Sequence, residues 1–134
     1  MANLDQSKWF TEISDRDGSA FSLRINKKLD EKQSPFQKVE MFETTDFGNL
    51  MIIDGCTMVS SRENFFYHEM ISHPALLAHP NPKNVVIIGG GDCGTLREVL
   101  KHPSVETVTQ IDIDELVSLF AYTHLTLHTN LRCM

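Results

Sequence analysis

The sequence predicts an α/β protein in which an antiparallel β domain is followed by a β-α-β unit. The apolar, β-branched run Val85–Ile88 is typical of a buried parallel strand. The G-x-G-x-x-G pattern that follows, with glycines at 89, 91 and 94, is typical of a tight turn into a helix. A second β-branched run, Val105–Ile111, ends at the acidic residue Asp112. Strand, turn, helix, strand and acid in this order are the layout of a nucleotide site.

The N-terminal part of the chain has the patterns of β-hairpins. Ala20–Ile25 and Lys38–Phe42 alternate apolar and polar residues, as half-buried strands do. Turn signals at Phe47–Asn49 and Asp54–Gly55 flank the apolar run Leu50–Ile53. We therefore expect hairpins of an antiparallel meander.

A helix is expected to link the two parts, over Arg62–His79. Pro74 should bend this helix or end its first half, because proline has no N–H to donate. The turn Pro80–Asn84 and a second helix, Thr95–His102, follow. Apolar residues recur at roughly helical spacing on the first helix: Phe65, Phe66, Met70, Leu76 and Leu77. Of these, Phe65, Phe66 and Met70 are interpreted as core. The expected segments are a β domain (1–61), the linking helix and turn (62–82), the start of the α/β domain (83–115) and a tail (116–134).

Size and composition restrict the partners. The 134 residues have room for one ordinary domain, or for a small domain and a fragment of another. A net charge of −6 argues against a nucleic-acid partner, which needs a basic face. Cys56, Cys93 and Cys133 form no C-x-x-C pair and indicate free thiols in a reducing compartment. Residues 1–12 have no signal-peptide core and no run has transmembrane length, so we expect a cytoplasmic protein without a membrane partner.

Asp92, within the glycine turn, changes the expected ligand. Dinucleotide enzymes place a pyrophosphate at this turn, where helix N-terminal amides favour negative charge. A carboxylate would repel that group and would suit a nucleoside that carries a sulfonium or an ammonium. The alternative is that Asp92 only caps the helix that opens at Gly94 or Thr95.

The charge distribution changes abruptly near the end of the chain. All 18 acidic residues lie at or before Glu115, and residues 116–134 contain one charged residue, Arg132. Leu116–Tyr122 begins like a surface helix, which normally has a charged face, but Thr123–Leu131 alternates threonine, leucine and histidine. We expect a reading-frame change or a truncation soon after Glu115; the alternative is a polar, uncharged terminal strand.

Several motifs occur together between Trp9 and Glu115. They are Gln37, the hairpin from Gly48 through Asp54-Gly55, the helical YHEM at 67–70, GGGDCGTLREV at 89–99, and Asp112-Ile113-Asp114-Glu115. In this combination the chain resembles the polyamine aminopropyltransferase (spermidine synthase) family. The resemblance implies an N-terminal β domain and the first, incomplete part of a Rossmann-like methyltransferase domain. It also implies a homodimer or homotetramer, assembled largely through the β domain.

The family transfers an aminopropyl group from decarboxylated S-adenosylmethionine to putrescine, which gives spermidine and methylthioadenosine. The donor is a co-substrate, so no cofactor is expected. The resemblance implies that Asp92 pairs with an ammonium and disfavours the carboxylate of ordinary S-adenosylmethionine, and that Asp112 accepts from both ribose hydroxyls. Gln37 would contact the nucleoside near its sulfur. Tyr67 and His68 would line the amine pocket, with Tyr67 as a helper in deprotonating the attacking amine.

The resemblance also marks departures. The family's general base lies in an Asp-Ser/Cys-Ser/Thr-Asp-Pro loop, which residues 1–134 do not contain, so no catalytic base is identified. Cys93 stands where the family often has glycine, and Asn64 where it often has an acid. The glycine-rich turn itself is complete, with Gly89, Gly90, Gly91 and Gly94.

Other functions remain as alternatives. One is a non-catalytic remnant that at most self-associates through its β domain. A nicotinamide-dependent oxidoreductase is opposed by Asp92 and by the upstream motifs. His68 and His73 flank Glu69, but they are one residue further apart than the two histidines of the zinc-binding H-E-x-x-H motif. This spacing turns the second ring away from the helix face of the first, so no metal is expected. His124 and His128 lack a third ligand.

Stability is expected to differ between the two parts. The strand Val85–Ile88 has one parallel neighbour in this sequence, so its other edge is bare and apolar. We expect the α/β part to be loosely folded, whereas the N-terminal β region keeps its fold.

Overall fold

A computed structural model describes residues 4–125 of the chain. The packing of the backbone divides the chain into two compact units, one up to Arg62 and one from Glu63 on. Each unit is described by itself. In residues 4–125, no helix combines the length and the apolar character that crossing a bilayer requires.

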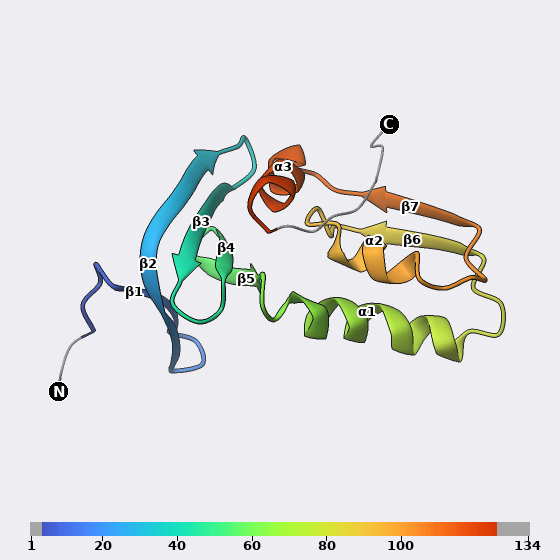
Figure 1. The fold of residues 1–134 in the computed structure, drawn as a ribbon, viewed down its shortest axis with the longest axis horizontal. Coiled ribbons are helices and arrows are strands. Elements are labelled where there is room, and N and C mark those ends of the chain that lie inside the picture. Colours follow the sequence, from blue (N-terminus) through green and yellow to red (C-terminus); the bar gives the residue numbers. More distant parts are fainter. Residues whose placement is uncertain (1–3, 126–134) are drawn as a thin grey trace. The chain divides into compact units, whose positions relative to one another are not determined.

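The first unit is a five-stranded antiparallel meander (Figure 1), which confirms the expected hairpins. The strands follow one another in sequence order, so each pairs with its neighbours along the chain. Their bounds are β1 (Trp9–Ser14), β2 (Ser19–Gln33), β3 (Lys38–Thr44), β4 (Asn49–Ile53) and β5 (Cys56–Ser60).

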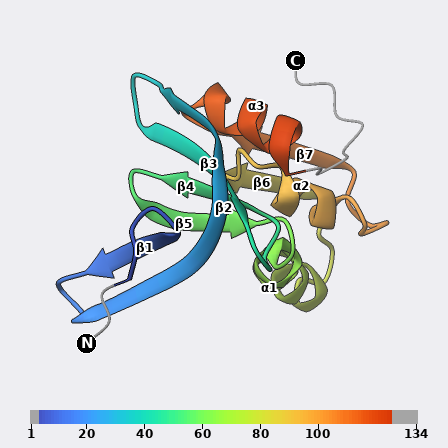
Figure 2. The same cartoon turned by 60° about the vertical axis from the view of Figure 1, so that its left-hand side comes forward.

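Strand β2 is much longer than its apolar alternation predicts. Its first half pairs with β1, and its second half pairs with β3 after two shifts of register (Figure 2). This second half is rich in charged residues, so no apolar period marks it as a strand. Ion pairs lie along this half of β2: Lys28 contacts Glu31 on its own strand and Glu40 on β3. Lys38, on β3, lies 3.1 Å from Glu31 and 3.2 Å from Glu40.

A tight turn and a cluster of buried side chains from β2, β3 and β4 hold the first unit together. The turn before β5 has the positive φ angles, 49° at Asp54 and 82° at Gly55, that tight hairpins need. It holds β4 and β5 in register, with Ile53 opposite Cys56. The buried core residues are Leu23, Phe42, Leu50 and Ile52, and Phe10, Ile25 and Phe47 pack against them.

The second unit contains the expected β-α-β arrangement, with β6 and β7 parallel from Asn84 opposite Thr107 to Ile88 opposite Ile111. Helix α2 is shorter than predicted, because the chain after Val99 tightens into bonds between residues three apart. Figure 1 shows α1 and α2 beside the two strands. The elements are α1 (Asn64–Ala78), β6 (Asn84–Ile88), α2 (Gly94–Val99), β7 (Thr107–Ile111) and α3 (Glu115–His124).

Helix α1 differs from its prediction in where it ends and in what it buries. Of the two outcomes expected at Pro74, a bend or an end, the end does not occur, because the helix continues to Ala78. Pro74 is exposed, so water can hydrogen-bond to the backbone carbonyl that it leaves without a partner. The residues interpreted as core, Phe65, Phe66 and Met70, are exposed, whereas Leu76 is buried. The buried residues recur every fourth position and are mainly polar: Asn64, His68, Ser72 and Leu76.

The two faces of the β6–β7 sheet differ in coverage. On one face Ile87 packs with Leu76 and Val99, and α1 packs against α2 beside it. On the other face the apolar side chains are open to solvent: Ile88 is 87% exposed, Val86 62% and Ile111 57%. Helix α3 includes residues 116–122, where the sequence predicts the start of a helix, and it ends at His124. Residues 126–134, which include His128, Arg132 and Cys133, lie outside the described part of the chain.

Candidate functional site

The glycine turn connects β6 to α2 and lies against the end of β7. The backbone N–H of Gly89 donates to the carbonyl of Ile111 at 2.7 Å, and the side-chain amide of Gln110 donates to the carbonyl of Gly90 at 2.9 Å. Gly89 and Gly90 have φ angles of 80° and 72°, which favour glycine. Cys93 takes the same left-handed conformation, with φ of 62°.

Asp112 lies directly over this turn. A Cβ atom at Gly91 would stand 2.8 Å from Oδ2 of Asp112, so a side chain at position 91 would collide with the carboxylate. The other oxygen, Oδ1, accepts from the backbone N–H of Asp114 at 3.0 Å. Asp112 is exposed, and it therefore presents an acceptor beside the turn.

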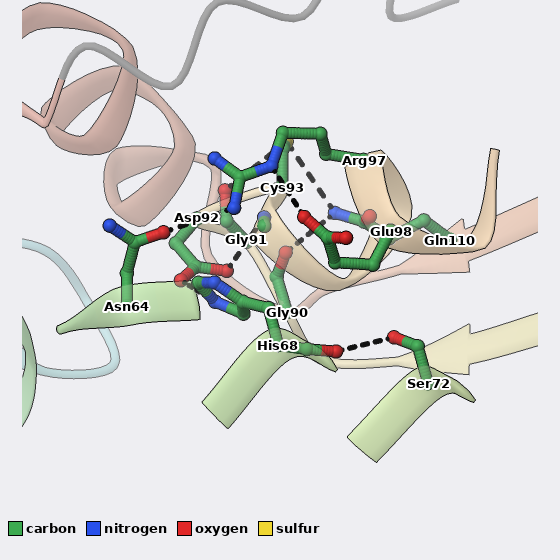
Figure 3. A network of polar contacts seen from close by, with 11 residues as sticks. Asn64, His68, Ser72, Gly90, Gly91, Asp92, Cys93, Arg97, Glu98 and Gln110 are labelled. Carbon is green, nitrogen blue, oxygen red and sulfur yellow. Dashed lines mark hydrogen bonds and ion pairs between the residues drawn. The ribbon is translucent and has the colours of Figure 1, made fainter. Parts of the chain in front are cut away.

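Asp92 uses both carboxylate oxygens within the protein (Figure 3). Oδ2 lies 2.7 Å from Nε2 of His68, and Oδ1 accepts from the backbone N–H of Gly94 at 3.2 Å. Cys93 is the N-cap residue of α2, and Asp92 before it accepts from the first N–H of the helix and is also contacted by His68 of α1. The side chain keeps 11% exposure, so the carboxylate is nearly but not completely enclosed.

His68 is completely buried, with 0% exposure, although it had been expected to line a pocket. Its Nδ1 atom has no hydrogen-bond partner among residues 4–125. Gly94 lies against the ring: a Cβ atom there would stand 2.0 Å from Cε1 of His68. Glycine at this position is therefore required by the ring of His68, a contact that connects α1 with α2.

Tyr67 and Gln37 lie differently. The Tyr67 side chain is 60% exposed on α1 and meets the ring of His68 edge-on, with centroids 5.4 Å apart. Gln37 belongs to the first unit, where its carbonyl accepts from the N–H of Ser34 at 2.9 Å just before β3. The structure thus brings Asp92, Asp112 and the glycines together within the second unit, whereas Gln37 belongs to the first unit.

A second polar cluster surrounds Glu98, which is 1% exposed on α2. Arg97 binds its Oε1 at 2.9 Å, and Lys101 pairs with its Oε2. Arg97 also donates to the side chain of Asn64 at 3.1 Å, which links α2 to the start of α1 (Figure 3). Burial raises the pKa of the Glu98 carboxyl, but the hydrogen bonds from Lys101 and Arg97 outweigh it, so that the pKa lies below its ordinary value.

Histidines extend this cluster. Nε2 of His73 lies 3.4 Å from Glu98, and its Nδ1 lies 2.8 Å from Nε2 of His102. Glu69, His73 and Glu98 could bring three ligand atoms within reach of a metal ion in the described residues. Lys101 already neutralises the Glu98 oxygen concerned, so the cluster is better explained as an ion-pair network.

Sequence reasoning missed both the His68–Asp92 contact and the Glu98 cluster. The partners lie far apart in the sequence, and no periodic pattern connects them. The one local signal is Gly94, because a glycine at the start of a helix can mark close approach of another element.

The chemistry of the turn follows from its two carboxylates. Ionised carboxylates only accept hydrogen bonds, so they suit hydroxyl and ammonium groups and repel phosphates. Asp112 is the more accessible acceptor, whereas Asp92 is held by His68 and Gly94. The geometry therefore favours a ligand with hydroxyl groups and a positive charge.

Comparisons with known proteins cover nearly the whole described chain. Residues 64–128 match the model of the spermine/spermidine synthase domain, and residues 8–60 match that of the spermidine synthase tetramerisation domain. A polyamine aminopropyltransferase of Stenotrophomonas maltophilia is 65% identical over 120 residues, which are 90% of this chain and 42% of that protein. One from Xanthomonas euvesicatoria is 68% identical over 110 residues, 82% of this chain and 39% of that protein.

Solved structures agree with these matches. A spermidine synthase crystallised with the transition-state analogue AdoDATO superimposes with a TM-score of 0.84 at 41% identity, over 90% of this chain and 41% of that one. Spermidine synthase from Thermotoga maritima gives the same TM-score and identity, over 43% of its length. The chain thus spans about two fifths of the relatives that it matches.

Proposed function

Because the chain belongs to the spermidine synthase family, we propose that its second unit provides the donor side of a polyamine aminopropyltransferase site. The donor is decarboxylated S-adenosylmethionine, and the acceptor is putrescine. The observation that carries the proposal is the placement of Asp92 and Asp112 at one glycine turn, which suits a nucleoside with a positive charge.

Each residue at the turn has a distinct role in this proposal. Asp112 accepts from the two ribose hydroxyls, and Gly91 leaves room for its carboxylate. Asp92 attracts an ammonium of the aminopropyl or polyamine chain and repels the carboxylate of ordinary S-adenosylmethionine. The contact of Gln37 with the nucleoside, implied by the resemblance, stays a prediction. Tyr67, on α1, faces the amine.

The reaction is a displacement at the carbon next to the sulfonium. The amine forms a C–N bond while the C–S bond breaks, and sulfur leaves with the electron pair as neutral methylthioadenosine. The attacking amine must first lose a proton, because primary amines are mostly protonated at neutral pH. The resemblance places the base for this step in a loop that the 134 residues do not contain, so we expect donor binding without turnover. Tyr67 is proposed only as a helper.

Assembly and location follow the same reasoning. The match of residues 8–60 to a tetramerisation domain supports self-association through the first unit. A form that self-associates through this unit without catalysis is the second candidate function, and the same match favours it. The cysteines, with no C-x-x-C pair, support the cytoplasm as the location.

Binding and turnover together test the proposal. Calorimetry should show that methylthioadenosine and decarboxylated S-adenosylmethionine bind and that NAD does not. We expect Asp112→Asn to weaken nucleoside binding about tenfold or more, and Glu115→Gln, an exposed acid at the start of α3, to change it little. Tighter binding of NAD, or unchanged binding by Asp112→Asn, would contradict the donor site.

The turnover assay measures methylthioadenosine release from donor and putrescine by the folded chain. No release would agree with a missing base. Clear release would show that these residues, or a second copy of the chain, supply the base.

A further inference from the structure

We propose that Gln110 is a positioning residue that holds the glycine turn at the distance from Asp112 that a nucleoside ribose requires. The inference rests on the proposed function and deepens it. Gln110 lies on β7, two residues before Asp112, and its side chain belongs to the partly buried face of that strand. Its effect on a ligand passes through the turn, because its hydrogen bond is made to the backbone of Gly90.

The side-chain amide of Gln110 reaches two residues of the turn (Figure 3). Nε2 donates to the carbonyl of Gly90 at 2.9 Å and lies 3.8 Å from Sγ of Cys93. A carbonyl only accepts, so the nitrogen of the amide has to face it. Oε1 of Gln110 is then left buried, with no hydrogen-bond partner among residues 4–125. A buried acceptor without a partner costs free energy, so stability alone does not explain an amide at this position.

The carbonyl of Gly90 has a second donor besides Gln110. The backbone N–H of Cys93 donates to the same oxygen at 2.8 Å. Removal of the amide would therefore leave this carbonyl with a partner, and an apolar side chain in its place would also remove the unpaired Oε1. Loss of the amide should thus change the position of the turn more than the stability of the second unit.

Gly90 lies between two other contacts with the end of β7. On one side the N–H of Gly89 donates to the carbonyl of Ile111 at 2.7 Å. On the other side a Cβ atom at Gly91 would stand 2.8 Å from Oδ2 of Asp112. Glycine has the greatest backbone freedom, so three consecutive glycines need outside contacts to keep one conformation. The glutamine amide supplies a hydrogen bond at the middle glycine, next to the one that makes room for Asp112.

Substitutions at position 110 test this role. Gln110→Leu fills similar space without a donor, and Gln110→Glu keeps the shape but presents a carboxylate, which only accepts. Calorimetry should show about tenfold weaker methylthioadenosine binding in both. The melting temperature of Gln110→Leu should not fall below that of the unmodified chain, because the change leaves no buried polar group unpaired. Thr109→Val, on the exposed face of β7, is the matched control and should change neither quantity.

A ligand without ribose hydroxyls separates the positioning of Asp112 from a general loosening of the site. We expect an analogue of methylthioadenosine that lacks both hydroxyls to bind the unmodified chain about tenfold more weakly than methylthioadenosine. In Gln110→Leu the same comparison should give about threefold or less, because the turn no longer holds the ribose against Asp112.

The outcomes separate the inference from the proposed function. Equal affinity of the unmodified and Gln110→Leu chains for methylthioadenosine would overturn the inference and leave the donor site standing. The same tenfold ratio between the two ligands in both chains would also overturn it, and so would a loss of affinity that accompanies a lower melting temperature, since either indicates a structural role. Failure of the unmodified chain to bind methylthioadenosine would overturn the proposed function, and the inference with it.

Discussion

Strands β4 and β6 are similar apolar runs, yet they have very different surroundings. β4 pairs with β3 on one side and β5 on the other, and its Leu50, Met51 and Ile52 are at most 2% exposed. In residues 4–125, β6 pairs only with β7, and Ile88 remains 87% exposed. An apolar run is typical of a strand whose side chains are buried, but the neighbouring elements determine whether they are buried.

The difference predicts where the chain is stable and where it associates. The first unit has a core of its own, built from β2, β3 and β4. The second unit has a core on one face of its sheet and solvent-exposed isoleucines on the other. A bare, apolar strand edge favours pairing with another chain. The predictions below test this contrast, from the largest expected effect to the smallest.

The strongest contrast is between two isoleucines. Ile52→Ala leaves a cavity in the first unit and should lower its free energy of unfolding by about 2–5 kcal/mol. Ile88→Ala removes an exposed side chain and should change that of the second unit by less than about 0.5 kcal/mol. Urea unfolding followed by the fluorescence of Trp9 reports on the first unit, and amide NMR signals report on the second. Equal losses in the free energy of unfolding in the two variants would contradict the contrast between the buried β4 and the exposed face of β6.

The contact of Gly94 with His68 comes next. Gly94→Ala forces a methyl group into the ring and should destabilise the second unit by about 1–3 kcal/mol. The φ angle of Gly94 is not positive, so the cost is steric rather than conformational. Adding His68→Ala should recover part of the loss, which a double-mutant cycle measures. Additive losses would mean that the ring and position 94 do not interact.

Glu98 gives the second unit a pH dependence. Its pKa is below the ordinary 4.5, because hydrogen bonds from Lys101 and Arg97 outweigh the effect of burial. Ionised Glu98 therefore contributes fully to the stability of the second unit above about pH 4.5, and this contribution is lost as the pH falls through the lowered pKa. Glu98→Gln should lower the free energy of unfolding of the second unit by about 1.5 kcal/mol near neutral pH and by less at about pH 3. A cost that does not decrease at low pH would contradict this.

Glu31 is the exposed counterpart in the first unit. Hydrogen bonds from Lys28 and Lys38 lower the pKa of its carboxyl to about 2, which an NMR titration would detect. Surface ion pairs are screened by salt, so Glu31→Gln should cost less than Glu98→Gln. Its effect on urea unfolding should disappear in about 0.5 M salt. An effect that persists in salt would show that this pair is not governed by solvent screening.

The two regions also differ in how well the sequence predicts them. Turn signals on both sides of the apolar run predict the hairpins around Leu50–Ile53, and the run itself is buried from Leu50 to Ile52. The charged second half of β2 has no such period and was missed. On α1 the prediction was wrong about the buried face: apolar residues were expected there, but the buried face contains His68 and Ser72. This face is buried because α1 packs against α2.

The same limit applies to the site. The β-α-β pattern places an acid at the end of β7 beside the glycine turn, and Asp112 lies there. The partner of Asp92 was not predictable, since His68 lies on another helix 24 residues away. Local patterns predict the elements, whereas long-range polar contacts require the packed structure.

Amide hydrogen exchange, measured with and without methylthioadenosine, tests the central claim most directly. We predict strong protection of β4 in both conditions and weak protection of β6 in the free chain, with a difference on the order of 10³ or more. Methylthioadenosine should increase protection at the glycine turn 89–94 and in β6. Strong protection of Val85–Ile88 in a free monomer, or no change at the turn on adding the nucleoside, would contradict the account.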